Sequence, residues 1–343
     1  MVRVAIVGAS GYTGAELLRL SLGHPRIEIA GVYARTQAGE QMEDQFPQFA
    51  GRFPQKLAAY DAAEVAKSAE VAFLALPHGD AANIARELHG RGLRVFDLSA
   101  DLRLRSLGDY EAWYGKHSAP ELLPRAIYGL VERHRKSIVD ARLVAVPGCY
   151  PTATLLALAP LLDGKLIESG DIIIDAKSGV SGAGRTPGRA THFPEVAGGV
   201  RAYKVAEHRH TPEIEQELSL AHGGPVRVTF TPHLIPMIRG IVSTCYARPT
   251  AKRPRAAYLD ALRETYRDQP FVAVVDHPPD SAHLTGSNRV HVSAFVDERT
   301  GRVIAISAID NLVKGAAGQA IQCLNVALGF PETEGLDAVG IFP

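Results

Sequence analysis

Cys149 is the residue of this chain whose type and setting offer the most chemistry. It lies in residues 146–152, VPGCYPT, directly before an apolar run at 153–162 that predicts a helix. The unpaired N–H groups and positive dipole at a helix start favour thiolate over thiol, and the thiolate is the nucleophile. The same N–H groups could hold an oxyanion that grows on a carbonyl attacked by the sulfur. The alternative is a buried structural cysteine, which is the commoner fate of a free Cys.

His208 and His210 are the candidates for acid/base chemistry, in residues 208–213, HRHTPE. Thr211 is predicted to be the N-cap of a helix and Pro212 its first residue, which places both histidines at a helix entrance. A neutral imidazole near a thiol can take its proton and later return one to a product oxygen. The i, i+2 spacing predicts that the two rings diverge and that only one reaches the sulfur. The alternative is two exposed loop histidines.

A glycine turn near the start of the chain predicts a dinucleotide site. Gly8-x-x-Gly11-x-x-Gly14 lies between a predicted strand at 2–7 and a predicted helix at 15–22. In this context the turn lets the backbone approach a pyrophosphate at the helix N-terminus. A purely structural turn is the alternative. The candidate cofactor contacts in the turn are Gly8, Ser10, Gly11, Tyr12, Thr13 and Gly14.

The residues after the second predicted strand, 27–33, indicate which dinucleotide is bound. NAD enzymes usually carry Asp or Glu there to hold the ribose 2′-hydroxyl, but this chain has Arg35 and Thr36. A guanidinium and a hydroxyl suit a 2′-phosphate, so the sequence favours NADP, unless Arg35 is merely a solvated surface residue. Ligands gather at the carboxyl ends of parallel strands, which makes Pro77 and His78 further candidates. His78 would otherwise cap the next helix.

A basic, glycine-rich loop follows a later strand at 177–185, KSGVSGAGR. Backbone N–H groups, serine hydroxyls and a cation together predict an anion cradle. A surface loop without a ligand is the alternative.

The composition limits the classes of function. Lys plus Arg and Asp plus Glu are both 37, so net charge gives no reason to propose nucleic acid or an anionic membrane as partner. The three cysteines, Cys149, Cys245 and Cys323, form neither a disulfide framework nor a zinc-site spacing. We expect no metal, no signal peptide and no membrane span, and therefore a cytoplasmic location.

The pattern of predicted elements indicates an α/β protein of two domains, as the length of 343 residues also suggests. Strands alternate with helices at first, which predicts a parallel sheet with right-handed crossovers. After the Cys149 helix, strand-like segments mostly lack intervening helices, which predicts a mixed or antiparallel sheet. These segments are 171–176, 226–231, 240–246, 290–297 and 302–310, with helices near 212–220 and 255–266. A last helix, 312–328, is predicted to pack on the first domain.

Together these motifs resemble the N-acetyl-γ-glutamyl-phosphate reductases, within the acyl-phosphate and semialdehyde dehydrogenase group. The likeness runs along nearly the whole chain. It includes the glycine turn, LPHG at 76–79, DLSADLR at 97–103, the cysteine and double-histidine motifs, the loop at 177–185 and DNLVKGAAGQA at 310–320. The resemblance implies a Rossmann domain, residues 1–148 joined by 312–343, and a glyceraldehyde-phosphate-dehydrogenase-like domain at 149–311 for catalysis, substrate binding and oligomerisation.

The resemblance also implies roles for these residues. Cys149 is the expected nucleophile, one of His208 and His210 the acid/base, and NADPH the hydride donor to a small acyl-phosphate substrate of arginine biosynthesis. Further implied contacts are Ser178, Gly179 and Asn311 with the cofactor and Arg103, Ser181 and Arg185 with the substrate. A homodimer or homotetramer is expected.

Two alternatives stay open. A carrier-linked reductase of lysine biosynthesis would have a cysteine neighbourhood closer to Gly-Cys-Asn-Ala-Thr, whereas CYPT at 149–152 favours the arginine branch. An NADP-binding redox sensor without turnover would have little use for a cysteine beside histidines.

Overall fold

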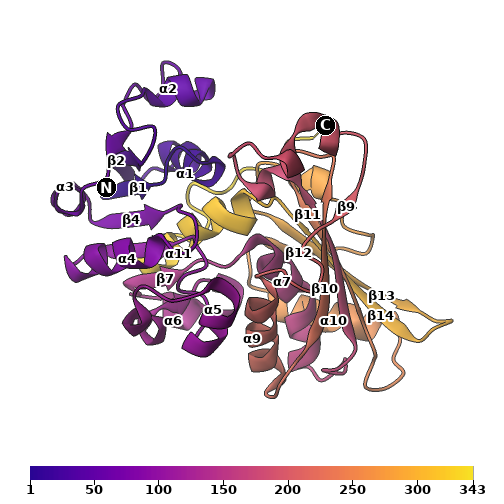
Figure 1. The fold of residues 1–343 in the computed structure, drawn as a ribbon. Helices are drawn as coiled ribbons and strands as arrows, with labels where there is room; N and C mark the ends of the chain where they lie inside the picture. Colours follow the sequence, from indigo (N-terminus) through magenta and orange to yellow (C-terminus); the bar gives the residue numbers. More distant parts are fainter. Residues whose placement is uncertain (343) are drawn as a thin grey trace. The chain divides into compact units, whose positions relative to one another are not determined.

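The chain folds into two compact units, described here from a computed structural model of residues 1–342, apart from the side chain of Ala190. Unit 1 comprises residues 1–148 and 316–337, and unit 2 comprises 149–315 together with the tail from Ala338 onward. The yellow C-terminal segment in Figure 1 therefore contributes to both units. The prediction that all of 312–343 joins the first domain is wrong in detail, because 312–315 and 338–342 belong to unit 2. Pro343, the last residue of that segment, lies outside the described residues.

Unit 1 is built on a seven-stranded parallel sheet, as the alternating pattern predicted. Its strand order is β3-β2-β1-β4-β5-β7-β6. All four residues of β4 are buried, as expected for a parallel strand with helices on both faces. The strands are β1 (Val2–Val7), β2 (Ile27–Ala34), β3 (Ala58–Ala59), β4 (Val71–Leu74), β5 (Arg94–Asp97), β6 (Ile127–Tyr128) and β7 (Leu143–Ala145).

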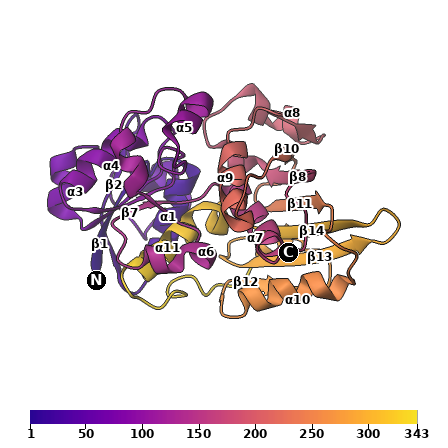
Figure 2. The same cartoon turned by 90° about the horizontal axis from the view of Figure 1, so that it is seen from below.

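Helices cover both faces of this sheet. Figure 2 shows α1 (Tyr12–Leu22), α6 (Val131–Ile138) and α11 (Gly318–Ala327) on one side and α3 (Ala62–Ser68) and α4 (Ala81–Gly90) on the other. The predicted helix 312–328 is divided, because a π-helical turn at Val313–Ala317 precedes α11. The shorter helices are α2 (Met42–Gln45), α5 (Leu107–Tyr114) and the 3-10 turns η1 (Pro47–Phe49) and η2 (Pro120–Arg125).

Unit 2 contains a seven-stranded mixed sheet, which confirms the predicted change of architecture. Its order is β12-β13-β14-β11-β8-β10-β9, with β8–β10 and β12–β13 parallel and the other neighbours antiparallel. The strands are β8 (Ile172–Gly179), β9 (Arg201–Ala202), β10 (Val228–Ile235), β11 (Ile241–Ala247), β12 (Val272–Val274), β13 (Val290–Asp297) and β14 (Arg302–Ile309).

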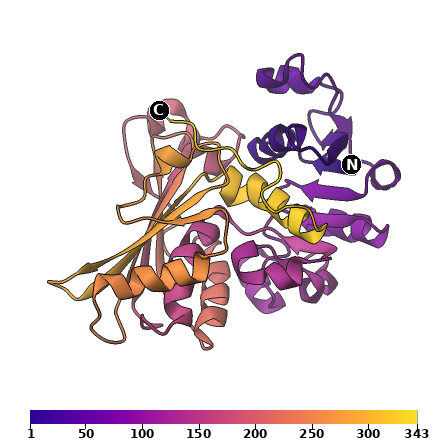
Figure 3. The ribbon, with the colours of Figure 1, turned by 180° about the vertical axis from the view of Figure 1, so that it is seen from behind.

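Three helices cover one face of the unit 2 sheet: α7 (Cys149–Asp163), α9 (Thr211–His222) and α10 (Arg255–Tyr266). Figure 3 shows this layer against the long strands from behind. Residues 150–162 of α7 are all buried, while along β11 every second residue is only half-buried. The sheet therefore has one covered and one more open face. The remaining short helices are α8 (Phe193–Val196), η3 (Val180–Ala183), η4 (Arg189–Thr191) and η5 (Ser281–Leu284).

None of the helices in residues 1–342 combines the length and apolar character needed to cross a bilayer.

Candidate active site

Cys149 differs from the other two cysteines in its surroundings. It is the first residue of α7 and is partly exposed, so the helix begins four residues earlier than predicted. Cys245 is fully buried, and burial raises the pKa of its thiol to about 12. Cys323 is also buried, and its Sγ donates a hydrogen bond to the carbonyl of Gly129 at 3.0 Å. Only Cys149 therefore combines access with a helix start, which is the setting of a reactive thiolate.

Gly315, in the π-helical turn, lies directly beside Cys149. A Cβ built on Gly315 would lie 2.8 Å from the Cβ of Cys149 and 3.3 Å from the carbonyl oxygen of Asp310. Buried Asp310 fixes this turn, because its carboxylate accepts the backbone N–H groups of Leu312 at 2.8 Å and Gly286 at 2.7 Å. The absence of a side chain at Gly315 thus leaves room for Cys149. Sequence reasoning missed this role; the only signal was a glycine inside an otherwise helical pattern.

Aromatic contacts bring both histidines to the residue after Cys149. The ring centroid of Tyr150 lies 5.5 Å from that of His208 and 6.0 Å from that of His210, with the rings close to perpendicular. The two imidazoles are 4.9 Å apart. The prediction that their rings diverge is therefore wrong, because Tyr150 packs edge-on against both. Tyr203 and Phe230 contact His208 as well, at 5.5 and 5.2 Å.

The two histidines differ in burial and in hydrogen bonding. His208 is buried, and burial, with help from Lys204 and Arg209, lowers its pKa to about 4. Its Nδ1 accepts the backbone N–H of His210 at 3.1 Å. His210 is partly exposed and is the N-cap residue of α9. The prediction that Thr211 is the cap is wrong by one residue, because α9 already begins at Thr211. His208 is thus a neutral packing residue, and His210 is the more accessible imidazole.

Three backbone donors at the start of the loop after β8 are bonded within unit 2. The N–H groups of Gly179, Val180 and Ser181 donate to the carbonyls of 240, 237 and 238 at 2.9, 2.9 and 3.2 Å. The hydroxyl of buried Ser178 donates to the carbonyl of Gly179 at 3.0 Å. The N–H groups of residues 179–181 are therefore not directed at an anion, and the predicted anion cradle would need the side chains or the later part of the loop.

Asn311 ties this loop to the segment that contains Gly315. Its Oδ1 accepts the N–H of Gly240 at 2.7 Å, and its Nδ2 donates to the Ser181 hydroxyl at 3.0 Å. Arg185 is partly exposed at the end of the loop. In unit 2, Gly315 therefore lies beside Cys149, and Asn311, four residues before Gly315, bonds to Ser181, although 162 positions separate Cys149 from Asn311.

The glycine turn of unit 1 is shaped as a dinucleotide turn requires. Gly8 has φ +95°, and a Cβ there would collide with the carbonyl of Ala75; a Cβ on Gly14 would collide with the carbonyl of Gly8. Helix α1 begins at Tyr12, and its N-cap residue Gly11 has no side chain to cap it. Backbone N–H groups at the start of a helix suit a pyrophosphate, so the residues fit a dinucleotide. Ser10, Tyr12 and Thr13 belong to this turn.

Arg35 and Thr36 follow β2 and are exposed. The guanidinium of Arg35 is 86% exposed and lies 3.7 Å from the carboxylate of Asp80, the residue before α4. Such an exposed ion pair is weak, so Arg35 is available to an anion. Pro77 and His78 lie in the same exposed loop as Asp80. His78 is not the cap of α4, because the carboxylate of Asp101 accepts the N–H groups there.

Arg103 bonds two backbone carbonyls of unit 1 that follow neighbouring strands. It is buried, and its guanidinium donates to the carbonyls of Val146 and Leu98, both at 2.7 Å. These two bonds hold the segments that follow β7 and β5. A contact of Arg103 with the substrate stays a prediction.

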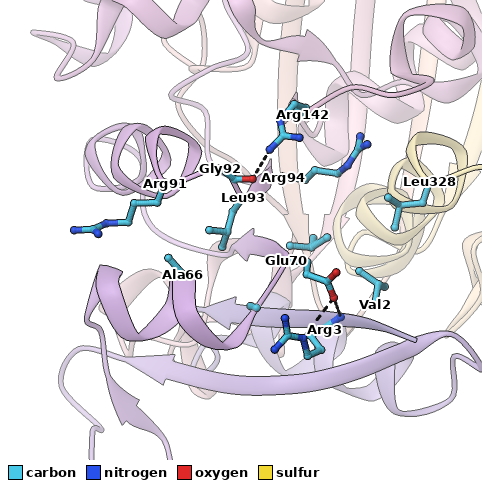
Figure 4. A pocket seen from close by; sticks show the side chains of 12 residues that line it. Val2, Arg3, Ala66, Glu70, Arg91, Gly92, Leu93, Arg94, Arg142 and Leu328 are labelled. Carbon is cyan, nitrogen blue, oxygen red and sulfur yellow. Dashed lines mark hydrogen bonds and ion pairs between the residues drawn. The ribbon is translucent and has the colours of Figure 1, made fainter.

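A cavity of about 420 Å³ opens where β1, β4 and β5 begin, at the sheet edge opposite the glycine turn. Figure 4 shows its arginines: Arg91 points away from the cavity, and Arg142 donates to the carbonyl of Gly92. Arg3 lies 3.5 Å from the carboxylate of Glu70. Arg3 and Arg142 thus already have partners within the cavity wall. None of the predicted site residues lines the cavity.

Across residues 1–342, no three His, Cys, Asp or Glu side chains are grouped so as to hold a metal ion.

Comparison with known proteins defines the class. Residues 3–141 match the NAD binding domain of semialdehyde dehydrogenases, and residues 149–311 match their dimerisation domain. The fold resembles aspartate semialdehyde dehydrogenase II from Vibrio cholerae, in a structure complexed with ASA (TM-score 0.69, 16% identity, 95% of this chain and 98% of that one). It also resembles aspartate semialdehyde dehydrogenase with NADP from Candida albicans (TM-score 0.66, 95% and 98% covered). The chain is thus an oxidoreductase of the semialdehyde dehydrogenase class, with a nicotinamide dinucleotide domain.

Relatives of higher identity narrow the family. N-acetyl-gamma-glutamyl-phosphate reductase from Rhodospirillum rubrum is 51% identical over 100% of this chain and 99% of its own length. The protein of that name from Geotalea daltonii is 49% identical, with both chains fully covered. The chain belongs to the N-acetyl-γ-glutamyl-phosphate reductase family.

Proposed function

We propose that this enzyme reduces the acyl phosphate of N-acetylglutamyl 5-phosphate to N-acetylglutamate 5-semialdehyde and phosphate, using NADPH. The observation that supports this most directly is Cys149, the one partly exposed cysteine of the three, at the first position of a buried helix and beside Gly315. Membership of the family supports the substrate, since the relatives carry its name.

The first step is covalent. The Cys149 thiolate attacks the side-chain acyl carbon, a C–S bond forms, the C–O bond to phosphate breaks, and phosphate leaves with its electron pair. Backbone N–H groups at the start of α7 are positioned for the oxyanion of the tetrahedral intermediate. The product is a thioester on Cys149.

The second half is a two-electron reduction of that thioester. NADPH, when bound, supplies the hydride; the glycine turn would hold its pyrophosphate, Arg35 and Thr36 its 2′-phosphate, and the loop with Pro77 and His78 its remaining part. The alkoxide left by hydride addition then collapses to the aldehyde, the C–S bond breaks, and protonated His210 gives its proton to the departing sulfur of Cys149. His210 acquires this proton before the first step, when it deprotonates the Cys149 thiol.

We assign the acid/base role to His210 and a positioning role to His208. A histidine whose pKa is lowered to about 4 is neutral at pH 7, and a neutral imidazole is a poor general acid. His208 instead supports His210, by accepting its backbone N–H and by packing against Tyr150. Ser181 and Arg185 are the proposed substrate contacts, and Ser178, Gly179 and Asn311 shape the floor of the loop that carries them.

Residues 149–311 of unit 2 match a dimerisation domain, which supports association between copies of this chain. We propose a homodimer or homotetramer that works in the cytoplasm. The half-exposed face of the mixed sheet supports association, and three cysteines that form no disulfide in the described residues fit a reducing compartment.

The test is Cys149→Ser with free N-acetylglutamyl phosphate and NADPH. Turnover should fall roughly a thousandfold or more, because a serine hydroxyl is rarely ionised at neutral pH. Binding of NADPH should persist, since the glycine turn is unchanged. Cys323→Ser is the matched control, since its hydroxyl can keep the bond to Gly129. Near wild-type turnover by Cys149→Ser contradicts the covalent mechanism, and a requirement for a carrier protein contradicts the substrate.

A further inference from the structure

Asp101 is buried in unit 1 and accepts an unusual number of hydrogen bonds. Its Oδ1 accepts the N–H of Gly79 at 2.7 Å, and its Oδ2 accepts the N–H groups of Ala81 at 3.1 Å and Ala82 at 3.0 Å. Asp80, the residue at the N-cap position of α4, makes no capping bond with its side chain. Asp101 therefore caps α4 from 20 positions away in the chain and fixes the loop that leads into the helix.

The loop that Asp101 holds lies beside the glycine turn. The N–H of Ala75 donates to the carbonyl of Val7 at 2.8 Å. Gly8 approaches Ala75 and Leu76 so closely that a Cβ on Gly8 would collide with the first. Residues 77–80 continue from this contact and are exposed. The exposed part of the loop is thus anchored at one end by the sheet and at the other by a buried carboxylate.

A stack of aromatic rings joins Asp101 to His78. The Tyr110 hydroxyl donates to Oδ1 of Asp101 at 2.9 Å, and burial together with Asp101 raises the pKa of Tyr110, which keeps that donor protonated. Tyr110 stacks on Tyr114 at 5.0 Å, and Tyr114 contacts the edge of the His78 ring at 5.6 Å. On its other side Tyr110 contacts His117 at 4.4 Å, whose Nε2 lies 2.7 Å from the carbonyl oxygen of Asp101.

We propose that Asp101 is a positioning residue for cofactor binding: it holds residues 77–79, and through Tyr110 and Tyr114 the ring of His78, in the conformation that receives the nicotinamide dinucleotide. This inference rests on the proposed function, since it takes the bound molecule to be NADPH. Asp101 itself touches no ligand. Asp101 is buried, and three of its four acceptor bonds hold residues 79–82 directly. The fourth, from Tyr110, reaches the same loop through the aromatic stack.

The experiment compares Asp101→Asn with the wild-type enzyme. The amide offers one acceptor oxygen in place of two, so at least one backbone donor loses its partner. The dissociation constant of NADPH, measured by fluorescence titration, should rise about tenfold or more. At saturating NADPH, kcat should stay within about threefold of the wild type, because uniform binding affects KM alone. Hydrogen exchange at Gly79, Ala81 and Ala82 should become faster.

Asp61→Asn is the matched control. Asp61 also caps a helix of unit 1, α3, by accepting the N–H groups of Ala63 and Glu64 at 2.8 and 2.9 Å. A general loss of stability should affect both variants, whereas a change in NADPH affinity should appear only in Asp101→Asn. Tyr110→Phe is a milder second variant in case Asp101→Asn does not fold, and it should weaken NADPH binding by about twofold to fivefold.

Unchanged NADPH affinity in Asp101→Asn, or in Tyr110→Phe if the first does not fold, overturns the proposal. A parallel loss of affinity in Asp61→Asn overturns it too. The outcome is separable from the proposed function, because NADPH binding is measured without turnover. If Cys149→Ser stays active, the covalent mechanism fails, yet the titration still decides the role of Asp101.

Discussion

The two units assemble their functional residues in different ways. In unit 1 the glycine turn, Arg35 and the loop with His78 each follow a strand of one parallel sheet. The carboxyl ends of parallel strands meet at one edge, so these loops come together by topology alone. In unit 2 the residues come from α7, the loop after β8, the start of α9 and the segment after β14. No general rule of a mixed sheet collects these segments.

Unit 2 therefore depends on particular contacts between distant parts of the chain. Tyr150 packs against both histidines, Gly315 leaves room for Cys149, and Asn311 holds Ser181. A substitution that touches no ligand should consequently harm turnover more in unit 2 than in unit 1. Unit 1 should respond mainly in the affinity for the cofactor.

Apart from Cys149→Ser, the largest effect on turnover is expected from His210→Asn. Loss of the acid/base should lower kcat roughly a hundredfold to ten-thousandfold, with little change in NADPH binding. His208→Asn should lower kcat much less, because the side-chain oxygen of Asn can still accept the N–H of residue 210. Steady-state kinetics on purified variants measures both. A larger loss of kcat in His208→Asn than in His210→Asn would make His208 the acid/base. It would also show that the more buried histidine is not limited to a positioning role.

The pH dependence of stability should single out His208. Its pKa is about 6.5 in the unfolded chain and about 4 when folded, so the folded state binds fewer protons between these values. Stability is therefore full above pH 6.5 and falls as the pH drops toward 4, by up to about 3 kcal/mol for this group. Urea unfolding at a series of pH values should show a shallower acid loss in His208→Gln. An identical pH slope in both proteins would contradict the proposed neutral, buried state.

Gly315→Ala tests the packing around Cys149 at a residue to which no ligand contact is assigned. The new methyl group would lie 2.8 Å from the Cβ of Cys149, so the nucleophile must shift. A displacement of about 1 Å costs roughly a hundredfold in rate, and alkylation of Cys149 by iodoacetamide should change with it. Gly170→Ala is the control, since no atom of the described residues lies within 4 Å of its Cβ position. Wild-type turnover in Gly315→Ala would contradict the view that catalysis in unit 2 depends on contacts between distant residues.

The same contrast explains what could be predicted from the sequence. Strand, glycine turn and helix are neighbours along the chain, so the parallel sheet and the placement of Gly8 and Arg35 follow from local pattern. Cys149 and the histidine pair were recognisable by type. The contact of Gly315 with Cys149, the packing of Tyr150 against the two imidazoles and the capping of α4 by Asp101 join residues remote in sequence. Such contacts depend on tertiary packing, which periodicity and turn residues do not encode.

The smallest effect should come from Arg35→Ala, at the exposed edge of unit 1. Loss of the guanidinium should raise KM for NADPH about tenfold and leave KM for NADH nearly unchanged, because only NADPH carries the 2′-phosphate. Asp80→Asn is a control of opposite sign: its carboxylate lies 3.7 Å from Arg35 and would repel a phosphate there, so its removal should improve NADPH affinity by about twofold. Both effects should shrink as salt is raised, since both groups are solvated. If Arg35→Ala weakened the binding of NADH and NADPH equally, Arg35 would act on the part that the two cofactors share and would not select NADPH.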